Sequence, residues 1–335
     1  MQPAPPPTPD RAAPDPAEFD EATRSPGPMV VALGGNALIR PGEAGTPAQQ
    51  YQRVAEVAEV LVALTGPAGL VVTHGNGPQV GVHLLRSELL KQQVPPTTLE
   101  LAVAATQAEI GLMIVQAMSN AQRDAPAPRP VVAVVTRVLV SASDPAFQEP
   151  TKFVGGFMDA ETAQIQAAEL GWQVRRDGDR GWRRVVPSPA PQRVLEVEQV
   201  AALCRQGNIV VACGGGGVPV VEAHGRLVGV EAVVDKDRAS AVLARALGAS
   251  RMIILTAVDA VQRDYGTSRA TPIHRIHADA LRRLWEAGQF PAGSMGPKIE
   301  AALSFLDGGG GSVLITSPEH LPRALAGEGG TLVLP

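Results

Sequence analysis

The sequence predicts a protein of the α/β class, with an open, mainly parallel sheet sandwiched between helices and a small protruding subdomain. Short apolar runs alternate with segments of helical periodicity, and three of these runs end in glycine-rich loops. The alternation lapses between residues 137 and 192, which is where we expect the subdomain. Hydrophobic residues make up 45% of the 335 residues, enough to cover such a sheet on both faces.

The first 28 residues are expected to be a disordered tail. They contain nine of the thirty prolines and show no apolar periodicity, so they cannot bury enough surface to offset the entropy of ordering. They also lack the apolar core of a secretory signal. We therefore expect the folded domain to span residues 29–335.

The elements of the first half follow from apolar runs, caps and breaks. MVVAL ends at a Gly-Gly pair and is typical of a buried parallel strand. Thr46 and Pro47 then offer a cap and a first helical residue, and apolar residues recur behind them at helical spacing. In chain order, the patterns predict strands at 29–33, 69–73 and 131–136, and helices after Thr46, at 78–91 and at 97–118.

Regular α/β structure is expected to return after the lapse at 137–192. That segment is rich in Arg, Asp, Gly and Pro, and we expect a small antiparallel subdomain there. Beyond it, the patterns predict strands at 208–213, 251–256 and 312–316, and helices starting near Asp235 and at 298–306.

Composition excludes several classes of function. The net charge of −4, without a basic run, argues against binding to nucleic acid or to an anionic membrane. No window of eighteen uninterrupted apolar residues predicts a membrane span. Cys204 and Cys213 are too few for a disulfide framework and are expected to be reduced thiols. None of the six histidines has the spacing of a zinc site, so no protein-held metal is expected.

Three predicted strands run directly into glycine loops, at residues 34–36, 75–77 and 214–217. Glycine at the carboxyl end of a strand lets backbone N–H groups approach an anion, and a following helix adds its positive end. Each loop alone could be a tight turn that needs glycine for steric reasons. Three loops together favour an anion site at the carboxyl edge of the sheet. Walker A and GxGxxG spacings are both missing from the sequence.

Lysine is rare in this chain, which has only Lys91, Lys152, Lys236 and Lys298 among 29 cationic residues. Lys236 lies between Asp235 and Asp237 at a predicted helix start, and we expect these carboxylates to keep its ammonium group charged. Lys298 also lies at a predicted helix N-terminus, where a cation is unfavourable unless an anion binds there. Compact ammonium groups suit the stabilisation of a transferring phosphoryl group, whereas a solvated capping cluster is the alternative explanation.

From Val30 to the C-terminus, the chain resembles the carbamate kinases of the amino acid kinase superfamily. The matching stretches are ALGGNAL (32–38), THGNGPQVG (73–81), DPAF and PTK (144–152), GWRRVVPSP (181–189), ACGGGGVPV (212–220), EAVVDKDRAS (231–240), LTAVDAV (255–261) and FPAGSMGPKIEAA (290–302). Other branches usually have a lysine before the first Gly-Gly, where this chain has Ala32 and Leu33. In carbamate kinases a lysine of the protruding subdomain replaces it, and Lys152 occupies the matching motif.

The resemblance implies an amino acid kinase-like fold, a homodimer in the cytoplasm, a role in arginine metabolism, and a nucleotide-binding half at about 208–335. It implies reversible phosphoryl transfer from ATP to carbamate, giving ADP and carbamoyl phosphate, with Mg²⁺ carried by the nucleotide. The implied catalytic residues are Lys152, Lys236, Asp237 and Lys298. The implied substrate- and phosphate-binding residues are Gly34, Gly35, Asn36, Gly75, Asn76, Gly77, Gly214, Gly215, Gly216 and Gly217. The implied nucleotide-binding residues are Thr256, Ala257, Val258, Asp259, Met295, Gly296 and Lys298.

The chain departs from the family pattern on both sides of Lys152. Phe153-Val154-Gly155-Gly156 follows it where Pro-Ile-Gly and an aromatic residue are common, and Glu149 replaces a common asparagine. An alternative function is therefore transfer to another small carboxylate, phosphate or phosphonate acceptor within the same fold. A catalytically silent nucleotide-binding regulator is a third possibility, which the retained lysines disfavour. His74 is expected to be structural rather than catalytic.

Overall fold

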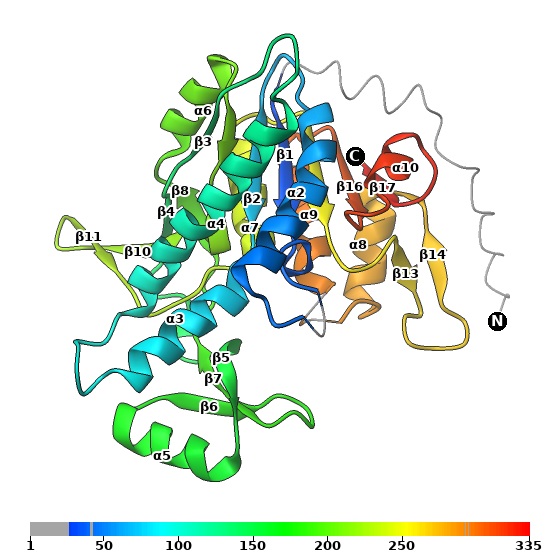
Figure 1. Cartoon of the computed structure of the whole chain (residues 1–335). Coiled ribbons are helices and arrows are strands. Elements are labelled where there is room, and N and C mark those ends of the chain that lie inside the picture. The colour runs from blue at the N-terminus through cyan, green and yellow to red at the C-terminus, as the bar shows by residue number, and fades with distance from the viewer. Residues whose placement is uncertain (1–26, 41–42, 292, 294) are drawn as a thin grey trace, which may run out of the picture.

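The centre of the molecule is an eight-stranded sheet, seen in a computed structural model that describes residues 27–40, 43–291, 293 and 295–335 (Figure 1). The strand order is β15-β17-β16-β12-β1-β2-β9-β3, and neighbouring strands are parallel except β16 and β17. The strands are β1 (Met29–Leu33), β2 (Leu70–His74), β3 (Val131–Ala133), β9 (Ile209–Val211), β12 (Arg251–Leu255), β15 (Arg275–His277), β16 (Ser312–Thr316) and β17 (Thr331–Leu334). The predicted open, mainly parallel sheet is confirmed.

Helices cover both faces of this sheet because its apolar strands alternate between two cores. Val30 and Ala32 of β1 pack in the core with one helix layer, and Val31 and Leu33 pack in the core with the other. The first layer contains α6 (Val197–Arg205), α7 (Lys236–Ala246), α8 (Ala278–Glu286) and α9 (Gly296–Asp307). The second contains α2 (Pro47–Ala63), α4 (Leu99–Ala121) and α10 (Leu321–Leu325).

Helix α4 has the length and hydropathy of a membrane span, but it lies against the sheet. In its most apolar window, 56% of the helix is buried within the structure, as in a core helix. Ile110, Ile114 and Met118 point into the core that α4 shares with α2. Packing within the folded chain therefore buries much of the apolar surface of α4.

A second, smaller sheet lies beside the central one, in the order β11-β10-β4-β8. Its strands are β4 (Arg137–Val140), β8 (Pro191–Val194), β10 (Val218–Ala223) and β11 (Arg226–Gly229). Strand β10 pairs with β4 in parallel and with β11 in a hairpin that projects from the body (Figure 1). The second sheet thus joins the segment after β3 to the segment after the third glycine loop.

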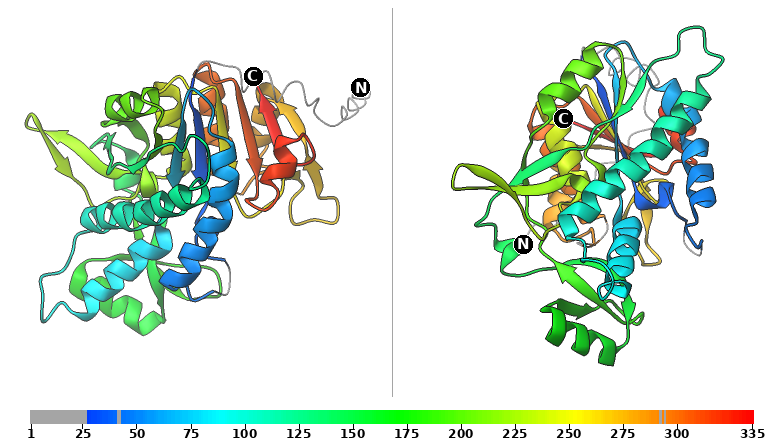
Figure 2. Two further views of the ribbon diagram at one scale, coloured as in Figure 1. Left: turned by 45° about the horizontal axis from the view of Figure 1, so that its top comes forward. Right: turned by 60° about the vertical axis from the view of Figure 1, so that its left-hand side comes forward.

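The protruding subdomain is smaller than the predicted segment of 137–192. It consists of the antiparallel sheet β5-β7-β6 and one helix, and all views show it set apart from the central sheet (Figures 1 and 2). Its elements are β5 (Lys152–Met158), α5 (Ala160–Leu170), β6 (Gln173–Arg176) and β7 (Trp182–Val186). The ends of the predicted segment instead form β4 and β8 of the second sheet, because both strands pair with each other and β4 also pairs with β10.

Helix α3 (Gly77–Leu89) connects the subdomain to the body. Val80 and Leu84 of α3 share a small core with Val154 of β5 and with α4. A Cβ atom on Gly81 would lie 3.3 Å from the Cα atom of Gly155, so the backbones of α3 and β5 approach closely at this point. The subdomain is therefore packed directly against the helix that starts at the second glycine loop.

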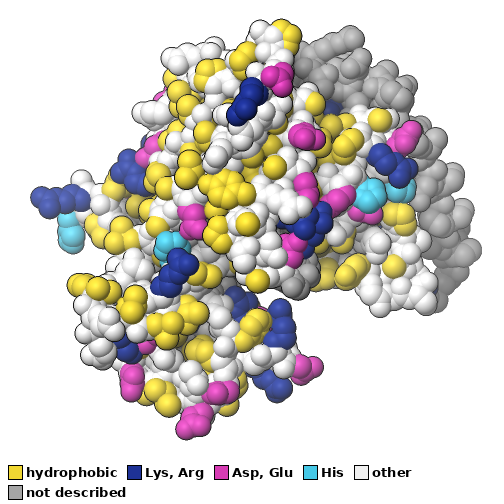
Figure 3. All heavy atoms as spheres, viewed as in Figure 1, with side chains coloured by type: hydrophobic (Ala, Val, Ile, Leu, Met, Phe, Trp, Pro, Cys, Tyr) yellow, Lys and Arg dark blue, Asp and Glu magenta, His cyan; other side chains and the backbone are white. Residues whose placement is uncertain are grey.

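The remaining elements are short connections around the sheet. They are the hairpin β13 (Val261–Arg263) and β14 (Thr271–Ile273), and the 3-10 turns η1 (Gly35–Ala37), η2 (Pro145–Phe147) and η3 (Gly214–Gly216). Residues 1–26 of the predicted tail lie outside the described residues. The carbonyl of Pro28 accepts a hydrogen bond from the Ser250 amide, so the end of that segment already belongs to the fold. Cationic and anionic side chains are interspersed over the face shown in Figure 3.

Candidate active site

A cavity of about 540 Å³ lies at the carboxyl edge of the central sheet, beside the protruding subdomain. Most predicted site residues line it, namely Gly34, Gly35, Gly75, Asn76, Gly77, Lys152, Gly215, Lys236, Asp237, Thr256, Ala257, Val258, Met295 and Lys298. Among the described residues that do not line it are Gly214, Gly216, Gly217, Asp259 and Gly296, each one or two positions from a lining residue. For Asn36 only the backbone is described, in the turn η1.

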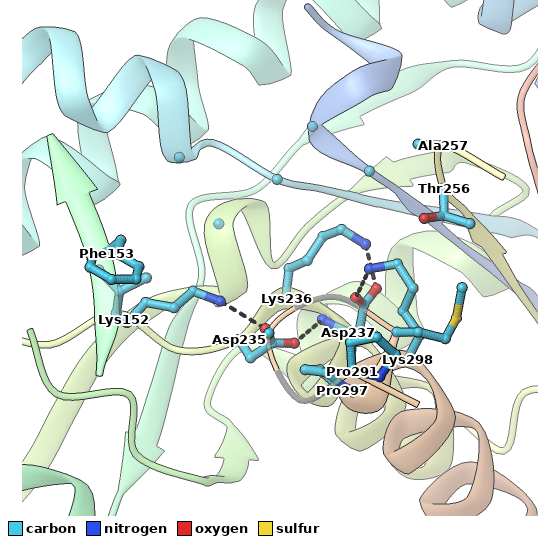
Figure 4. Close-up of a pocket in the computed structure, with 18 of the residues that line it drawn as sticks. Lys152, Phe153, Asp235, Lys236, Asp237, Thr256, Ala257, Pro291, Pro297 and Lys298 are labelled. Carbon is cyan, nitrogen blue, oxygen red and sulfur yellow. Dashed lines mark hydrogen bonds and ion pairs between the residues drawn. The ribbon is translucent and has the colours of Figure 1, made fainter. Parts of the chain in front are cut away.

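Two of the lysines share one carboxylate at the centre of this cavity (Figure 4). Asp237 lies in the first turn of α7, and its side chain is only 3% exposed. One of its oxygens accepts a hydrogen bond from the Lys236 ammonium, and the other accepts one from Lys298 at 3.1 Å. Because both oxygens are engaged, Asp237 fixes two cations side by side that would otherwise repel each other.

Lys152 reaches the same cavity from the protruding subdomain. Its Nζ atom lies 2.9 Å from Oδ2 of Asp235, while Oδ1 of Asp235 caps α7 by accepting from the Asp237 amide. Burial raises the pKa of Asp235, but the charge and hydrogen bond of Lys152, together with the Lys236 ammonium and the Arg238 amide, outweigh it and hold the pKa below its usual value. Asp235 therefore ties the subdomain to the helix start that carries Lys236.

Two opposing effects act on the ammonium group of Lys236, namely its burial and its carboxylate neighbour. Burial lowers the pKa of Lys236 below its usual value, and the Asp237 carboxylate opposes this effect without overcoming it. Lys236 still donates a hydrogen bond to the Asp237 carboxylate, so one of the two expected carboxylate neighbours pairs with it. Its second neighbour, Asp235, is engaged mainly by Lys152. A bound anion would supply the missing compensation.

The glycine loops offer fewer free amides than their sequence suggests. The amides of Gly34 and Gly75 donate to the carbonyls of neighbouring strands, at 2.9 and 3.0 Å. The amides of Gly216 and Gly217 donate within their own loop. These four groups already have partners, so an anion in the cavity would meet the amides of other loop residues.

Side chains in and next to the second glycine loop fill the space that a Cβ atom would need on two glycines of the third loop. A Cβ atom on Gly214 would lie 2.4 Å from Nε2 of His74. One on Gly215, whose φ is +63°, would lie 2.0 Å from Nδ2 of Asn76. Glycine is required at both positions because any side chain would collide with the neighbouring loop.

His74 is buried and uncharged, as its structural interpretation requires. Burial lowers the pKa of His74 to about 4, and the nearby Lys236 ammonium contributes in the same direction. Its Nδ1 atom lies 3.0 Å from the Gly75 carbonyl oxygen, which can only accept, so Nδ1 carries the proton.

The far end of the cavity has an apolar and aromatic wall that the sequence did not reveal. Ala260, Gln262, Tyr265 and Phe290 line it together with the predicted Thr256–Val258 and Met295. Tyr265 lies in the turn between β13 and β14 and is 61% exposed. Asp259 instead accepts a hydrogen bond of 2.8 Å from Ser317. The wall residues have no common period in the sequence, so only the folded chain brings them together.

The Lys152–Asp235 pair generates a prediction about the subdomain. Asp235→Asn keeps a good helix cap but removes the charge that faces Lys152. We expect the β5 amides to exchange hydrogen up to about fivefold faster, the factor that matches ~1 kcal/mol for a partly exposed ion pair. Hydrogen-exchange mass spectrometry of Asp235→Asn, Lys152→Met and the double variant measures this. If the exchange rates of the double variant show the sum of the two single effects on free energy, Lys152 and Asp235 do not act as a pair in holding the subdomain.

The buried His74 generates a prediction about acid stability. Its pKa of about 4 lies below the usual histidine value of 6.5, so between these values the unfolded chain binds a proton that the folded chain does not. Stability is then fully present above pH 6.5 and lost as the pH falls toward 4, by about 2 kcal/mol between pH 7 and pH 5. His74→Asn should flatten this dependence in urea titrations. His224→Asn, on the exposed hairpin, is the control, and equal slopes in both variants would contradict the assignment.

Comparisons with known proteins agree with this geometry. Residues 28–317 match the model of the Amino acid kinase family. A carbamate kinase of Thermococcus kodakarensis is 44% identical over 310 residues, covering 91% of this chain and 98% of that protein. A carbamate kinase of Escherichia coli is 40% identical, with 91% and 98% covered. The structure of the Giardia lamblia carbamate kinase bound to AMP-PNP superposes with a TM-score of 0.85 at 36% identity, covering 92% of this chain and 98% of that one. The chain therefore belongs to the amino acid kinase family, and within it to the carbamate kinases.

Proposed function

We propose that this chain catalyses reversible phosphoryl transfer between ATP and carbamate, giving ADP and carbamoyl phosphate. One observation carries the proposal: ammonium groups from three separate segments line one cavity between the glycine loops and an apolar wall. Phosphoryl transfer needs little more from a protein than alignment of the reactants and neutralisation of charge. The cavity supplies both.

The chemistry needs no general base. A carbamate oxygen is already anionic, so it attacks the γ-phosphorus directly while the bond from phosphorus to the β–γ bridging oxygen breaks and ADP leaves. Negative charge spreads over the oxygens in transit, where Lys152 and Lys236 would stabilise it. Asp237 would orient Lys236 and Lys298, and Lys298 would contact the ATP phosphates. Glycine loops 34–36, 75–77 and 214–217 would hold carbamate and the phosphoryl group.

The nucleotide would lie along the far wall, with its base against the apolar and aromatic residues there. Of the residues expected to bind it, Thr256–Val258 and Met295 line this wall while Asp259 and Gly296 flank it, and Tyr265 and Phe290 extend the same surface. Both aromatic side chains offer a flat surface for a purine. This arrangement directs the phosphates toward Lys298 at the start of α9.

Mg²⁺ is expected to arrive with the nucleotide. Within the described part of the chain, no group of three or more His, Cys, Asp and Glu side chains could hold a metal ion. The two carboxylates of the cavity, Asp235 and Asp237, are engaged by lysines. The donor set therefore fits a metal bound through phosphate oxygens, where it would neutralise part of the triphosphate charge.

We extend the proposal to a cytoplasmic homodimer that acts in arginine metabolism. Leu101 and Leu112 of α4 are 57% and 58% exposed, and their eleven-residue spacing places them on one side of the helix. This apolar side supports α4 as part of the interface. Cys204 and Cys213 are buried free thiols, which suits a reducing compartment.

A direct assay tests the identity of the acceptor. ADP release is measured with carbamate, acetylglutamate, phosphonates and nucleoside monophosphates at equal concentration. Phe153 lines the cavity beside Lys152, at the position where the sequence departs from the family pattern. Turnover with carbamate alone supports the proposal, whereas turnover only with another acceptor contradicts it.

The lysines themselves generate a prediction with an internal control. Lys236→Ala should lower kcat by about 10²-fold or more, the scale of one lost charge-stabilising donor. Lys91→Ala removes the fourth lysine, which pairs with Glu88 on α3 away from the cavity, and should leave kcat unchanged. Steady-state kinetics of both variants decide the point, and equal turnover in the two would refute a catalytic role for Lys236.

A further inference from the structure

Helix α4 carries two buried polar side chains, Thr106 and Gln107, within an otherwise apolar buried face. Thr106 is fully buried and Gln107 is 4% exposed, yet neither lines the cavity. Burying a side-chain amide is unfavourable unless its donors and acceptor find partners. Thr106 bonds to Asn76 of the second glycine loop, whereas Gln107 bonds to Thr136, which in turn contacts both ends of the third glycine loop.

The side-chain amide of Gln107 bonds to both the backbone N–H and the carbonyl of Thr136, as the backbone of a neighbouring strand would. Its Oε1 atom accepts from the Thr136 amide at 2.9 Å and from the Thr136 hydroxyl at 3.1 Å. Its Nε2 atom donates to the Thr136 carbonyl at 3.1 Å. One glutamine therefore satisfies every polar group of Thr136 and fixes the direction of its hydroxyl proton.

Thr136 in turn closes the third glycine loop at both ends. The Cys213 amide, just before the loop, donates to the Thr136 hydroxyl at 2.8 Å. The Val218 amide, just after it, donates to the Thr136 carbonyl at 2.9 Å. Cys213 has a φ of +50°, in the left-handed region that a residue with a side chain occupies only when its surroundings enforce it. The Gln107–Thr136 pair provides that enforcement.

Thr106 holds the second loop from the adjacent position on the helix. Its hydroxyl accepts from Nδ2 of Asn76 at 2.9 Å and donates back to the α4 backbone. The Asn76 side chain occupies the space above Gly215, and the Gln107 side chain lies against Gly214. Two consecutive residues of α4 therefore set the distance between two anion loops.

We infer that Gln107 is a positioning residue for phosphoryl transfer, which acts through Thr136 on the shape of the 213–218 loop. The inference rests on the proposed function of the cavity. A run of four glycines has little conformational preference of its own, so its geometry must come from its surroundings. Gln107 supplies this geometry without touching a substrate.

The chain contains a matched control at the other end of the same helix. Gln122 is also buried, and its amide also pairs with one residue, accepting from the Arg129 amide at 2.7 Å and donating to its carbonyl at 2.8 Å. It lies about 22 Å along the helix from Gln107. Gln107→Met and Gln122→Met therefore both remove a pair of hydrogen bonds to the backbone of one residue, next to the site and far from it, and Gln107→Met also removes the bond from the Thr136 hydroxyl.

The experiment measures steady-state kinetics in the direction of ATP synthesis and hydrogen exchange in both variants. We expect Gln107→Met to lower kcat/KM for carbamoyl phosphate by about tenfold or more, with the KM for ADP changed less than about twofold. The 213–218 amides should exchange about tenfold faster than in Gln122→Met. In Gln122→Met, kcat/KM for carbamoyl phosphate and the KM for ADP should both match those of the wild type, even if the melting temperature of the variant is lower.

Gln107→Met kinetics that match those of Gln122→Met would overturn the inference. If the wild type does not use carbamoyl phosphate at all, the proposed function fails, and the exchange rates alone then decide the inference. Thr136 gives a second test in case Gln107→Met does not fold. Thr136→Ser keeps the hydroxyl and should retain wild-type constants, whereas Thr136→Val should behave as Gln107→Met. Equal constants in the two Thr136 variants also overturn it.

Discussion

The site depends on holding three partly buried cations in one cavity before any substrate is present. Three ammonium groups and two carboxylates meet in the cavity, which leaves one positive charge in excess. Asp237 neutralises the repulsion between Lys236 and Lys298, and Asp235 does the same for Lys152. Burial still lowers the pKa of Lys236, so an arriving anion stabilises the charged form and is itself stabilised.

The fold provides this arrangement by bringing separate segments to one edge of a parallel sheet. Lys236 and Lys298 lie in the first turns of α7 and α9, whereas Lys152 is the first residue of β5 in the subdomain. Lys152 lines the cavity together with Phe153 and Val154, the first two residues of the departure from the family pattern. The Arg183 guanidinium lies 5.5 Å from the centre of the Phe153 ring and 5.1 Å from that of Phe157, so the subdomain's own arginine packs against these aromatic rings.

Much of the fold and part of the site could be predicted from the sequence, because they depend on local patterns. Apolar runs predicted the central strands β1, β2, β3, β9, β12 and β16 but not β15 and β17, and the sequence Asp235-Lys236-Asp237 correctly indicated a helix start. The Lys152–Asp235 pair could not be predicted, since 83 residues separate its partners. The narrower subdomain could not be predicted either, because β4 finds its parallel partner β10 only in the folded chain.

A crystal structure with ADP, Mg²⁺ and a planar fluoroaluminate in place of the phosphoryl group would test the central claim most directly. We expect the ammonium groups of Lys152, Lys236 and Lys298 all to lie within hydrogen-bond distance of the fluoroaluminate or of the ADP oxygens beside it. A fluoroaluminate bound beyond the reach of Lys236, with that lysine still paired only to Asp237, would contradict it.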